Sequence, residues 1–223
     1  MEDYIKEAAL RLGADVCGTG HIDRFEDAPE GFSPRDLFDR CRSVIAVGIA
    51  LPRGLFQVSP RLLYSHFNTE ICSVVDRVSL GLAKELENTY HCLAVPVPSD
   101  APNEYWDAEN MTAKGMISMR HTAVQCGLGS LGKNTLLIHP EFGNRLTVGA
   151  VLTDLELNSD PLQPDLCIPG CRICLDHCPV QAISGGSVKQ KSCRLNTYGT
   201  TARGFDTVDC NRCRALCPRN RMK

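Results

Sequence analysis

Thirteen cysteines are the residues of this 223-residue chain with the greatest capacity for chemistry. Eight of them gather towards the C-terminal end: Cys167, Cys171, Cys174, Cys178, Cys193, Cys210, Cys213 and Cys217. The N-terminus is acidic and amphipathic, whereas a secretory signal is basic and then apolar, so we expect a cytoplasmic protein. Because disulfide frameworks are rare in that reducing compartment, we expect the eight cysteines to bind metal.

The spacing of these cysteines favours iron–sulfur clusters. Two runs, 167–178 and 210–217, each end in a Cys followed by proline. Bacterial ferredoxins have the run C-x2-C-x2-C-x3-C-P, whose last Cys ligates the other cluster in two-cluster proteins. Here the first gap has three residues, and the second run is one Cys short, for which Cys193 is the natural replacement. The crossover rule then predicts one [4Fe-4S] cluster on Cys167, Cys171, Cys174 and Cys217, and another on Cys178, Cys193, Cys210 and Cys213.

A pair of zinc sites is the alternative for these cysteines, because Cys-x2-Cys pairs also suit tetrahedral zinc. The C-x3-C-P endings and the lack of a His at zinc-finger spacing favour iron–sulfur clusters. The other five cysteines are isolated on apolar segments and are expected to be small core residues. Among those five, Cys126 is the one beside a glycine-rich loop, which makes it a weak functional candidate.

The glycine-rich loop, CGLGSLGKNT, matches two nucleotide motifs incompletely. Gly127, Gly129 and Gly132 fit G-x-G-x-x-G, but we expect a helix before the loop and a strand after it, the reverse of the Rossmann order. Asn134 stands where a P-loop requires Ser or Thr. We therefore expect these glycines, with Lys133 and Asn134, to bring backbone N–H groups and a cation close to a phosphate- or amide-bearing cofactor.

Hydrophobic periodicity predicts the elements that must position these residues. We expect helices over 4–12, 69–87 and 113–126, and strands over 43–51, 93–97, 136–139 and 146–152. Thr69 is the candidate N-cap of the longest helix, and Tyr64, His66, Asn68 and Trp106 are expected in loops near a substrate pocket. Helices interleaved with buried strands indicate an α/β or α+β fold.

After residue 154 the sequence becomes rich in Pro and Cys and poor in apolar runs. We therefore expect a domain over 1–158 and a second, over 159–223, that metal binding stabilises. Residues 160–223 carry a formal charge of +5 and the rest −7, within a net charge of −2. Compensation of anionic clusters is the favoured explanation, and RNA binding through exposed Arg212, Arg214, Arg219 and Arg221 is the alternative. No apolar run is long enough to span a membrane.

The phrase GLGSLGKNTLLIHPEFG, followed by the paired cysteine runs, resembles epoxyqueuosine reductase and the corrinoid-dependent reductive dehalogenases. The stretches LGADVCGTG and SVIAVGIALP also fit the start of that family, so the resemblance extends over nearly the whole chain. It implies an α+β fold, with a nitroreductase-like domain holding cobalamin and a small ferredoxin-like domain with two [4Fe-4S] clusters that supply its electrons.

Three departures qualify this resemblance. The family's Arg-Asp pair before the glycine loop, whose Asp donates a proton, is here Arg120 and His121. A His can also donate a proton near neutral pH, although an ordinary helix residue is the equal alternative. An extra residue, Pro169 or Gly170, lengthens the first cysteine run. The chain printed here ends at Lys223, without the helical repeats that the resemblance implies for tRNA binding, so tRNA is not the expected substrate.

The sequence therefore predicts an iron–sulfur oxidoreductase. Its clusters would pass electrons to a cofactor, for which the resemblance suggests cobalamin, or to a small-molecule or corrinoid substrate. A ferredoxin- or flavodoxin-type donor is the expected partner, and Arg120 and His121 are the expected catalytic residues. The alternative is a non-catalytic electron-transfer protein or an activator of a corrinoid protein.

Overall fold

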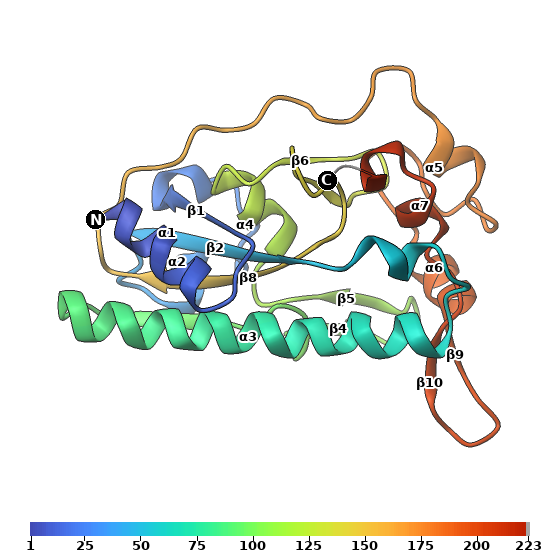
Figure 1. Cartoon of the computed structure of the whole chain (residues 1–223), viewed down its shortest axis with the longest axis horizontal. Helices are drawn as coiled ribbons and strands as arrows, with labels where there is room; N and C mark the ends of the chain where they lie inside the picture. The colour runs from blue at the N-terminus through green and yellow to red at the C-terminus, as the bar shows by residue number, and fades with distance from the viewer. Residues whose placement is uncertain (222–223) are drawn as a thin grey trace.

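A computed structural model describes residues 1–221 of the chain. Its helices are α1 (Glu2–Arg11), α2 (Pro34–Leu37), α3 (Leu62–Tyr90), α4 (Met119–Gln125), α5 (Ile173–Asp176), α6 (Gln190–Thr197) and α7 (Arg212–Ala215), with 3-10 turns η1 (Ile22–Phe25), η2 (Arg53–Phe56) and η3 (Pro218–Arg221). Its strands are β1 (Val16–His21), β2 (Ser43–Ala50), β3 (Ala94–Val97), β4 (Tyr105–Asp107), β5 (Thr112–Lys114), β6 (Ser130–Leu131), β7 (Leu137–Ile138), β8 (Leu146–Thr153), β9 (Tyr198–Thr200) and β10 (Asp206–Val208). The fold mixes helix and sheet, as expected (Figure 1).

A four-stranded antiparallel sheet in the order β1-β2-β8-β3 forms the centre of the molecule. Strands β2 and β8 pair along their full lengths, from Ser43 opposite Thr153 to Ala50 opposite Leu146. Almost every residue of these two strands is buried, which agrees with their β-branched and apolar sequences. The sheet is therefore covered on both faces.

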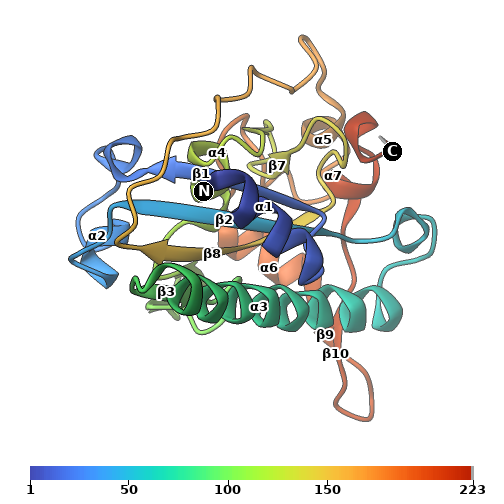
Figure 2. The same cartoon turned by 60° about the vertical axis from the view of Figure 1, so that its left-hand side comes forward.

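Alternate residues of β2 supply two separate cores, because successive side chains of a strand point to opposite faces. Ile45 and Val47 pack with residues of α1 and α3, such as Val75 and Leu82. Val44 and Ala46 pack with the opposite layer, which contains α4. Figure 2 shows α1 and α3 lying together on the near side of the sheet.

Helix α3 begins seven residues before the predicted N-cap, so the assignment of Thr69 as a cap was wrong. Its first turns bury Tyr64 against Phe56 and Val208, and the Ser65 hydroxyl donates to the Asp206 carbonyl at 3.2 Å. This contact with the C-terminal part extends the helix. The helix predicted over 113–126 was also too long, because residues 112–114 pair with β4 and α4 begins at Met119.

The part of the chain after β8 crosses the molecule to the end where α5, α6 and α7 gather (Figure 1). Its elements are short, and its buried hydrophobic residues within the described part of the chain are Leu157, Ala182 and Val208. That is too little apolar burial to stabilise a separate core. Among the helices that the structure describes, none has the length and apolarity to cross a membrane.

Candidate functional site

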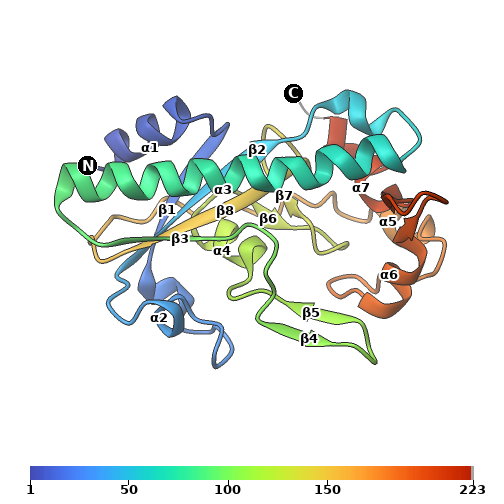
Figure 3. The same cartoon turned by 90° about the horizontal axis from the view of Figure 1, so that it is seen from below.

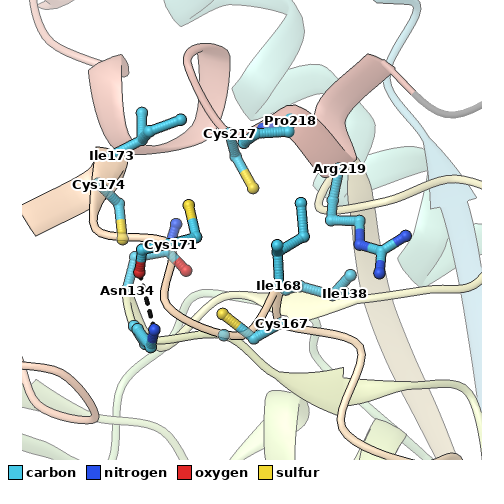
Figure 4. A pocket seen from close by; sticks show the side chains of 12 residues that line it. Asn134, Ile138, Cys167, Ile168, Cys171, Ile173, Cys174, Cys217, Pro218 and Arg219 are labelled. Carbon is cyan, nitrogen blue, oxygen red and sulfur yellow. Dashed lines mark hydrogen bonds between the residues drawn. The ribbon is translucent and has the colours of Figure 1, made fainter.

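Four cysteines from three segments surround a small cavity at one end of the molecule. Cys167 and Cys171 come from the loop before α5, Cys174 lies within α5, and Cys217 follows α7. Figure 4 shows their sulfur atoms around a common space, with Ile138 and Ile168 beside them. Long-range folding thus places Cys217 with three cysteines that precede it by more than forty residues.

The thiols of this first group interact electrostatically. Burial raises the pKa of Cys174, and the neighbouring Cys217, Cys167 and Cys171 raise it further. Burial also raises the pKa of Cys217, while the backbone N–H groups of Arg219 and Asn220 oppose that rise. The raised pKa values of Cys174 and Cys217 favour their neutral thiol forms in the free protein, and metal binding would displace their protons.

The remaining four cysteines of the C-terminal part, Cys178, Cys193, Cys210 and Cys213, line one side of a much larger cavity. Burial, followed by repulsion from Cys193 and Cys210, raises the pKa of Cys213 to about 11. Asn134, which borders the first group, donates through Nδ2 to the Cys213 carbonyl at 2.9 Å, so the two groups are close neighbours. The backbone N–H of Ala182 donates to Cys178 Sγ at 3.2 Å.

One buried polar atom beside this second group lacks a partner. The Asn211 side-chain nitrogen Nδ2 is buried and has no hydrogen-bond acceptor within residues 1–221. Asn211 lies between Cys210 and Cys213 in the sequence, and an N–H group there suits the sulfur atoms of an iron–sulfur cluster. Within residues 1–221, no three or more Cys, His, Asp or Glu side chains lie close enough together to hold a single metal ion. The donor set and this unpaired N–H fit a cluster bound by four separate thiolates.

The large cavity has a volume of about 980 Å³ and is partly open to solvent. Its walls come from the segments 24–34, 98–103, 113–125, 134–136, 178–198 and 210–213. Figure 3 shows the β4–β5 hairpin approaching α6 beside this region. The two are tied by Gln190, which accepts from the Ala113 N–H at 3.0 Å and donates to the Ala113 carbonyl at 3.2 Å. A cavity of this size is at the upper end of the range for cofactor and small-molecule sites.

Arg120 and His121 both line this cavity, from the first turn of α4. Arg120 donates to the Thr135 carbonyl at 3.0 Å and to its hydroxyl at 3.1 Å. Desolvation by the surrounding protein lowers the pKa of Arg120 even though its side chain is open to the cavity, and the positive charge of Arg214 lowers it further. His121 Nδ1 lies 2.7 Å from the Ser118 hydroxyl.

The glycine-rich loop does not lie in the large cavity as a unit. A Cβ on Gly127 would meet the Pro161 carbonyl at 2.7 Å, and one on Gly129 would meet the Ile138 carbonyl at 2.1 Å. These two glycines thus allow close packing within the chain itself, and Gly127 also has a φ of +76°. Gly132, Lys133 and Asn134 border the first cysteine group. Of the five loop residues predicted to bind a cofactor, Asn134 is the one that also lines the large cavity.

Residues 64, 68 and 214 form a network that the sequence interpretation missed. Tyr64 and Asn68 lie in α3 rather than in a loop, and Arg214 is half-buried rather than exposed. Its guanidinium donates to the Tyr64 hydroxyl at 3.2 Å and to Asn68 Oδ1 at 3.3 Å. No local pattern in the sequence signals this contact, because its partners lie about 150 residues away. Cys126, the other candidate, is fully buried and donates to the Val44 carbonyl.

Trp106 lies in β4, not in a loop, and half of its surface is exposed. The Arg194 guanidinium lies 5.3 Å from the centre of its ring and 5.8 Å from that of Tyr198. Arg194 and Tyr198 line the large cavity. This cation–π stack therefore borders the cavity from its outer side.

Comparisons with known proteins identify one consistent set of relatives. No family model matches the chain. It is 32% identical to the epoxyqueuosine reductase of Bacillus cereus over 87% of this chain and 52% of the relative, and 33% identical to that of a Synechococcus species over 86% and 60%. The chain thus spans between half and two thirds of the length of these curated relatives.

Solved structures agree with this result at the level of the fold. Epoxyqueuosine reductase from Streptococcus thermophilus superposes with a TM-score of 0.72 at 20% identity, over all of this chain and 67% of the other. A reductive dehalogenase described as suggesting a mechanism for B12-dependent dehalogenation superposes with a TM-score of 0.74 at 18% identity, over 98% and 31%. Another similar structure is an epoxyqueuosine reductase with a modified tRNA stem loop, at a TM-score of 0.69 and 19% identity, over 98% and 65%.

Proposed function

Because the chain is related to the epoxyqueuosine reductases, we propose that it is an iron–sulfur reductase whose two [4Fe-4S] clusters pass electrons to a reaction site in the large cavity. One observation carries this proposal: eight cysteines form two groups of four, and the second group faces a cavity that also holds Arg120 and His121. Electron supply, proton supply and space for a substrate are thereby brought together.

In this proposal the cluster ligands follow the crossover pairing. Cys167, Cys171, Cys174 and Cys217 hold the first cluster, and Cys178, Cys193, Cys210 and Cys213 hold the second. The proposal also assigns residues 1–158 to a nitroreductase-like domain and 159–223 to a ferredoxin-like domain. The scarcity of buried apolar residues after 159 supports this division, since metal binding would then supply the missing folding energy.

The positions of the two cysteine groups support a direction for the proposed electron flow. The first cysteine group surrounds a small cavity of its own, whereas the second lines the reaction space directly. Electrons from an external donor, which we propose to be a ferredoxin- or flavodoxin-type protein, therefore enter at the first group and leave from the second.

Arg120 and His121 supply charge and a proton in this scheme. The Ser118 hydroxyl engages His121 Nδ1 and fixes the orientation of the ring. Nε2 is then the ring nitrogen that delivers a proton to the reduced substrate, a role suited to imidazole near neutral pH. The Arg120 guanidinium, held by Thr135, faces the same cavity and stabilises negative charge that develops there.

We propose cobalamin as the cofactor that fills part of the cavity. When bound, it would supply a cobalt centre able to transfer electrons to the substrate. The cavity's volume and its opening to solvent support this choice. The substrate is proposed to be a small molecule or another corrinoid. The similar structure with a tRNA stem loop makes tRNA a substrate that the experiments must also include.

The test is iron, sulfide and cobalt analysis of anaerobically purified protein, with visible spectra before and after cobalamin is added. We expect about eight iron atoms per chain, as two [4Fe-4S] clusters require, and stoichiometric uptake of corrinoid. About eight iron atoms without corrinoid uptake would instead support the electron-transfer alternative. Zinc in place of iron would refute both functions.

A further inference from the structure

Each cysteine group has a half-buried cation nearby that forms no ion pair with a carboxylate of residues 1–221. Lys133 is half-buried at the first group, and Arg214 is half-buried next to Cys213 of the second. Across residues 1–221, no Asp or Glu oxygen lies within 4.0 Å of either cationic group. Half-buried charges without a counter-ion are costly unless another negative group faces them.

Lys133 is held against the first group by the chain itself. Its ammonium donates to the Cys171 carbonyl at 2.7 Å, and the residue lines the cavity that the four thiols surround. This contact uses one of its three N–H donors, so the charge stays beside the thiols. Lys133, which fits part of a phosphate-binding loop in the sequence, therefore places its charge beside the first cysteine group.

Arg214 is fixed even more firmly. Besides its bonds to Tyr64 and Asn68, it donates to the Asn144 carbonyl at 2.8 Å and to the Leu146 carbonyl at 3.2 Å. The guanidinium also lies 5.8 Å from the centre of the Phe56 ring. All of these acceptors are neutral, so the network positions the positive charge without cancelling it.

A fixed positive charge changes the reduction potential of a nearby cluster in a known direction. Reduction adds one electron and no proton to the cluster, so the reduced form is more negative and gains more from a cation. The cation therefore raises the reduction potential. The effect is larger at half-buried positions, because water screens the charge less there.

On this basis we propose that Lys133 and Arg214 are two separate potential-setting cations, Lys133 for the cluster of Cys167, Cys171, Cys174 and Cys217, and Arg214 for the cluster of Cys178, Cys193, Cys210 and Cys213. The inference rests on the proposed function, because it requires both clusters. Arg214 then favours the reduced form of the cluster that lies beside the reaction cavity. Lys133 does the same at the entry point.

The experiment is a redox titration of the iron-loaded protein with dithionite as the electron donor, followed by electron paramagnetic resonance. In Arg214→Met, we expect the ratio of reduced to oxidised second cluster at a fixed potential to fall about tenfold, or about 59 mV for a one-electron couple. The first cluster should be unchanged. In Lys133→Met, the potential of the first cluster should fall in the same way, and that of the second should be unchanged.

Charge-conserving variants separate electrostatics from packing. Arg214→Lys and Lys133→Arg keep the charge and should keep the potential, even where lost hydrogen bonds lower thermal stability. Arg77→Met, on the exposed surface of α3, is the control for removing a distant cation. Asn68→Asp keeps Arg214 but places a carboxylate beside it, and should lower the second potential even where Arg214→Met fails to load iron.

The outcomes distinguish this inference from the proposed function. Eight iron atoms with potentials that do not change in Arg214→Met, Asn68→Asp and Lys133→Met would overturn the inference and leave the function intact. Equal shifts of both clusters in each variant would overturn the separate assignment. A protein that binds no iron would overturn the proposed function and this inference together.

Discussion

The two cysteine groups differ in what surrounds them, although their sequences are nearly a repeat. The first is enclosed by the end of the glycine-rich loop, α5 and the start of η3, around a small cavity of its own. The second lines the large cavity, which Arg120 and His121 also line. Similar cysteine spacing has thus been placed in two environments, and under the proposed function the first would receive electrons and the second would deliver them.

If both groups bind clusters as proposed, their surroundings would give the clusters different reduction potentials. The reduction potential of a cluster depends on charge, hydrogen bonds to sulfur and access of solvent. The first receives N–H groups from Arg219 and Asn220 at Cys217. The second has the N–H of Ala182 at Cys178, the unpaired amide of Asn211 and an open cavity.

The largest expected effect is the loss of one group without the other. Replacing Cys213 by Ala should reduce iron from about eight to about four atoms per chain, because a [4Fe-4S] cluster needs all four of its thiolates. Iron analysis and electron paramagnetic resonance would measure this. Cys72→Ala, outside both groups on α3, is the matched control and should keep all the iron.

The crossover pairing gives this prediction a second readout. Cys217→Ala should remove the same cluster signal as Cys167→Ala, although fifty residues separate the two positions. If Cys217→Ala instead removes the signal that Cys210→Ala removes, Cys217 belongs to the second cluster and the crossover pairing is wrong.

The next largest effect concerns the cavity side of the second group. His121→Ala should lower turnover about 10²-fold or more with iron content unchanged, because it removes the proposed proton donor. The assay would follow oxidation of reduced methyl viologen with a test substrate and cobalamin-loaded protein. His66→Ala, on the exposed surface of α3, is the control and should keep full turnover. Equal turnover in the two variants would exclude His121 as the donor.

A smaller effect separates the cluster cysteines from the thiols packed in the core. Burial raises the pKa of Cys17 from about 9 to about 12, so its neutral form is favoured in the folded state. In the iron-loaded protein its alkylation by iodoacetamide, read by mass spectrometry, should therefore stay slow from pH 8 to 10 and rise only near pH 12. The urea-unfolded chain is the control and should react with a midpoint near pH 9. The same midpoint in the folded protein would contradict the prediction.

The smallest effect tests the extra residue in the first run. Gly170 has a φ of +72°, with open space around its Cβ position. Gly170→Ala should therefore cost about 1 kcal/mol through backbone strain alone. Thermal unfolding would measure this cost. The rate at which a chelator removes iron from each cluster would show whether the first group is the one affected. Gly54→Ala also has open space but no positive φ, and should leave both measurements unchanged.

Sequence periodicity predicted the parts of the fold that depend on local burial. The expected strands over 43–51 and 146–152 match β2 and β8 closely, because continuous β-branched runs favour buried strands. The start of α3 could not be predicted in this way, since contacts of Tyr64 and Ser65 with β10 determine it. The pairing of β5 with β4 likewise shortened the helix expected over 113–126.

The sequence by itself determined the chemistry that this chain can offer: eight clustered thiols, an Arg-His pair and a glycine loop that permits close backbone approach. Tertiary structure decided what each of these meets. It packed Gly127 and Gly129 against the chain's own carbonyls, turned Lys133 towards Cys171 and secured Arg214 to α3. The physical reason is distance along the chain. Ligand spacing and backbone freedom are local properties. A cavity wall, or a set of neutral acceptors around a cation, is assembled from segments far apart in sequence.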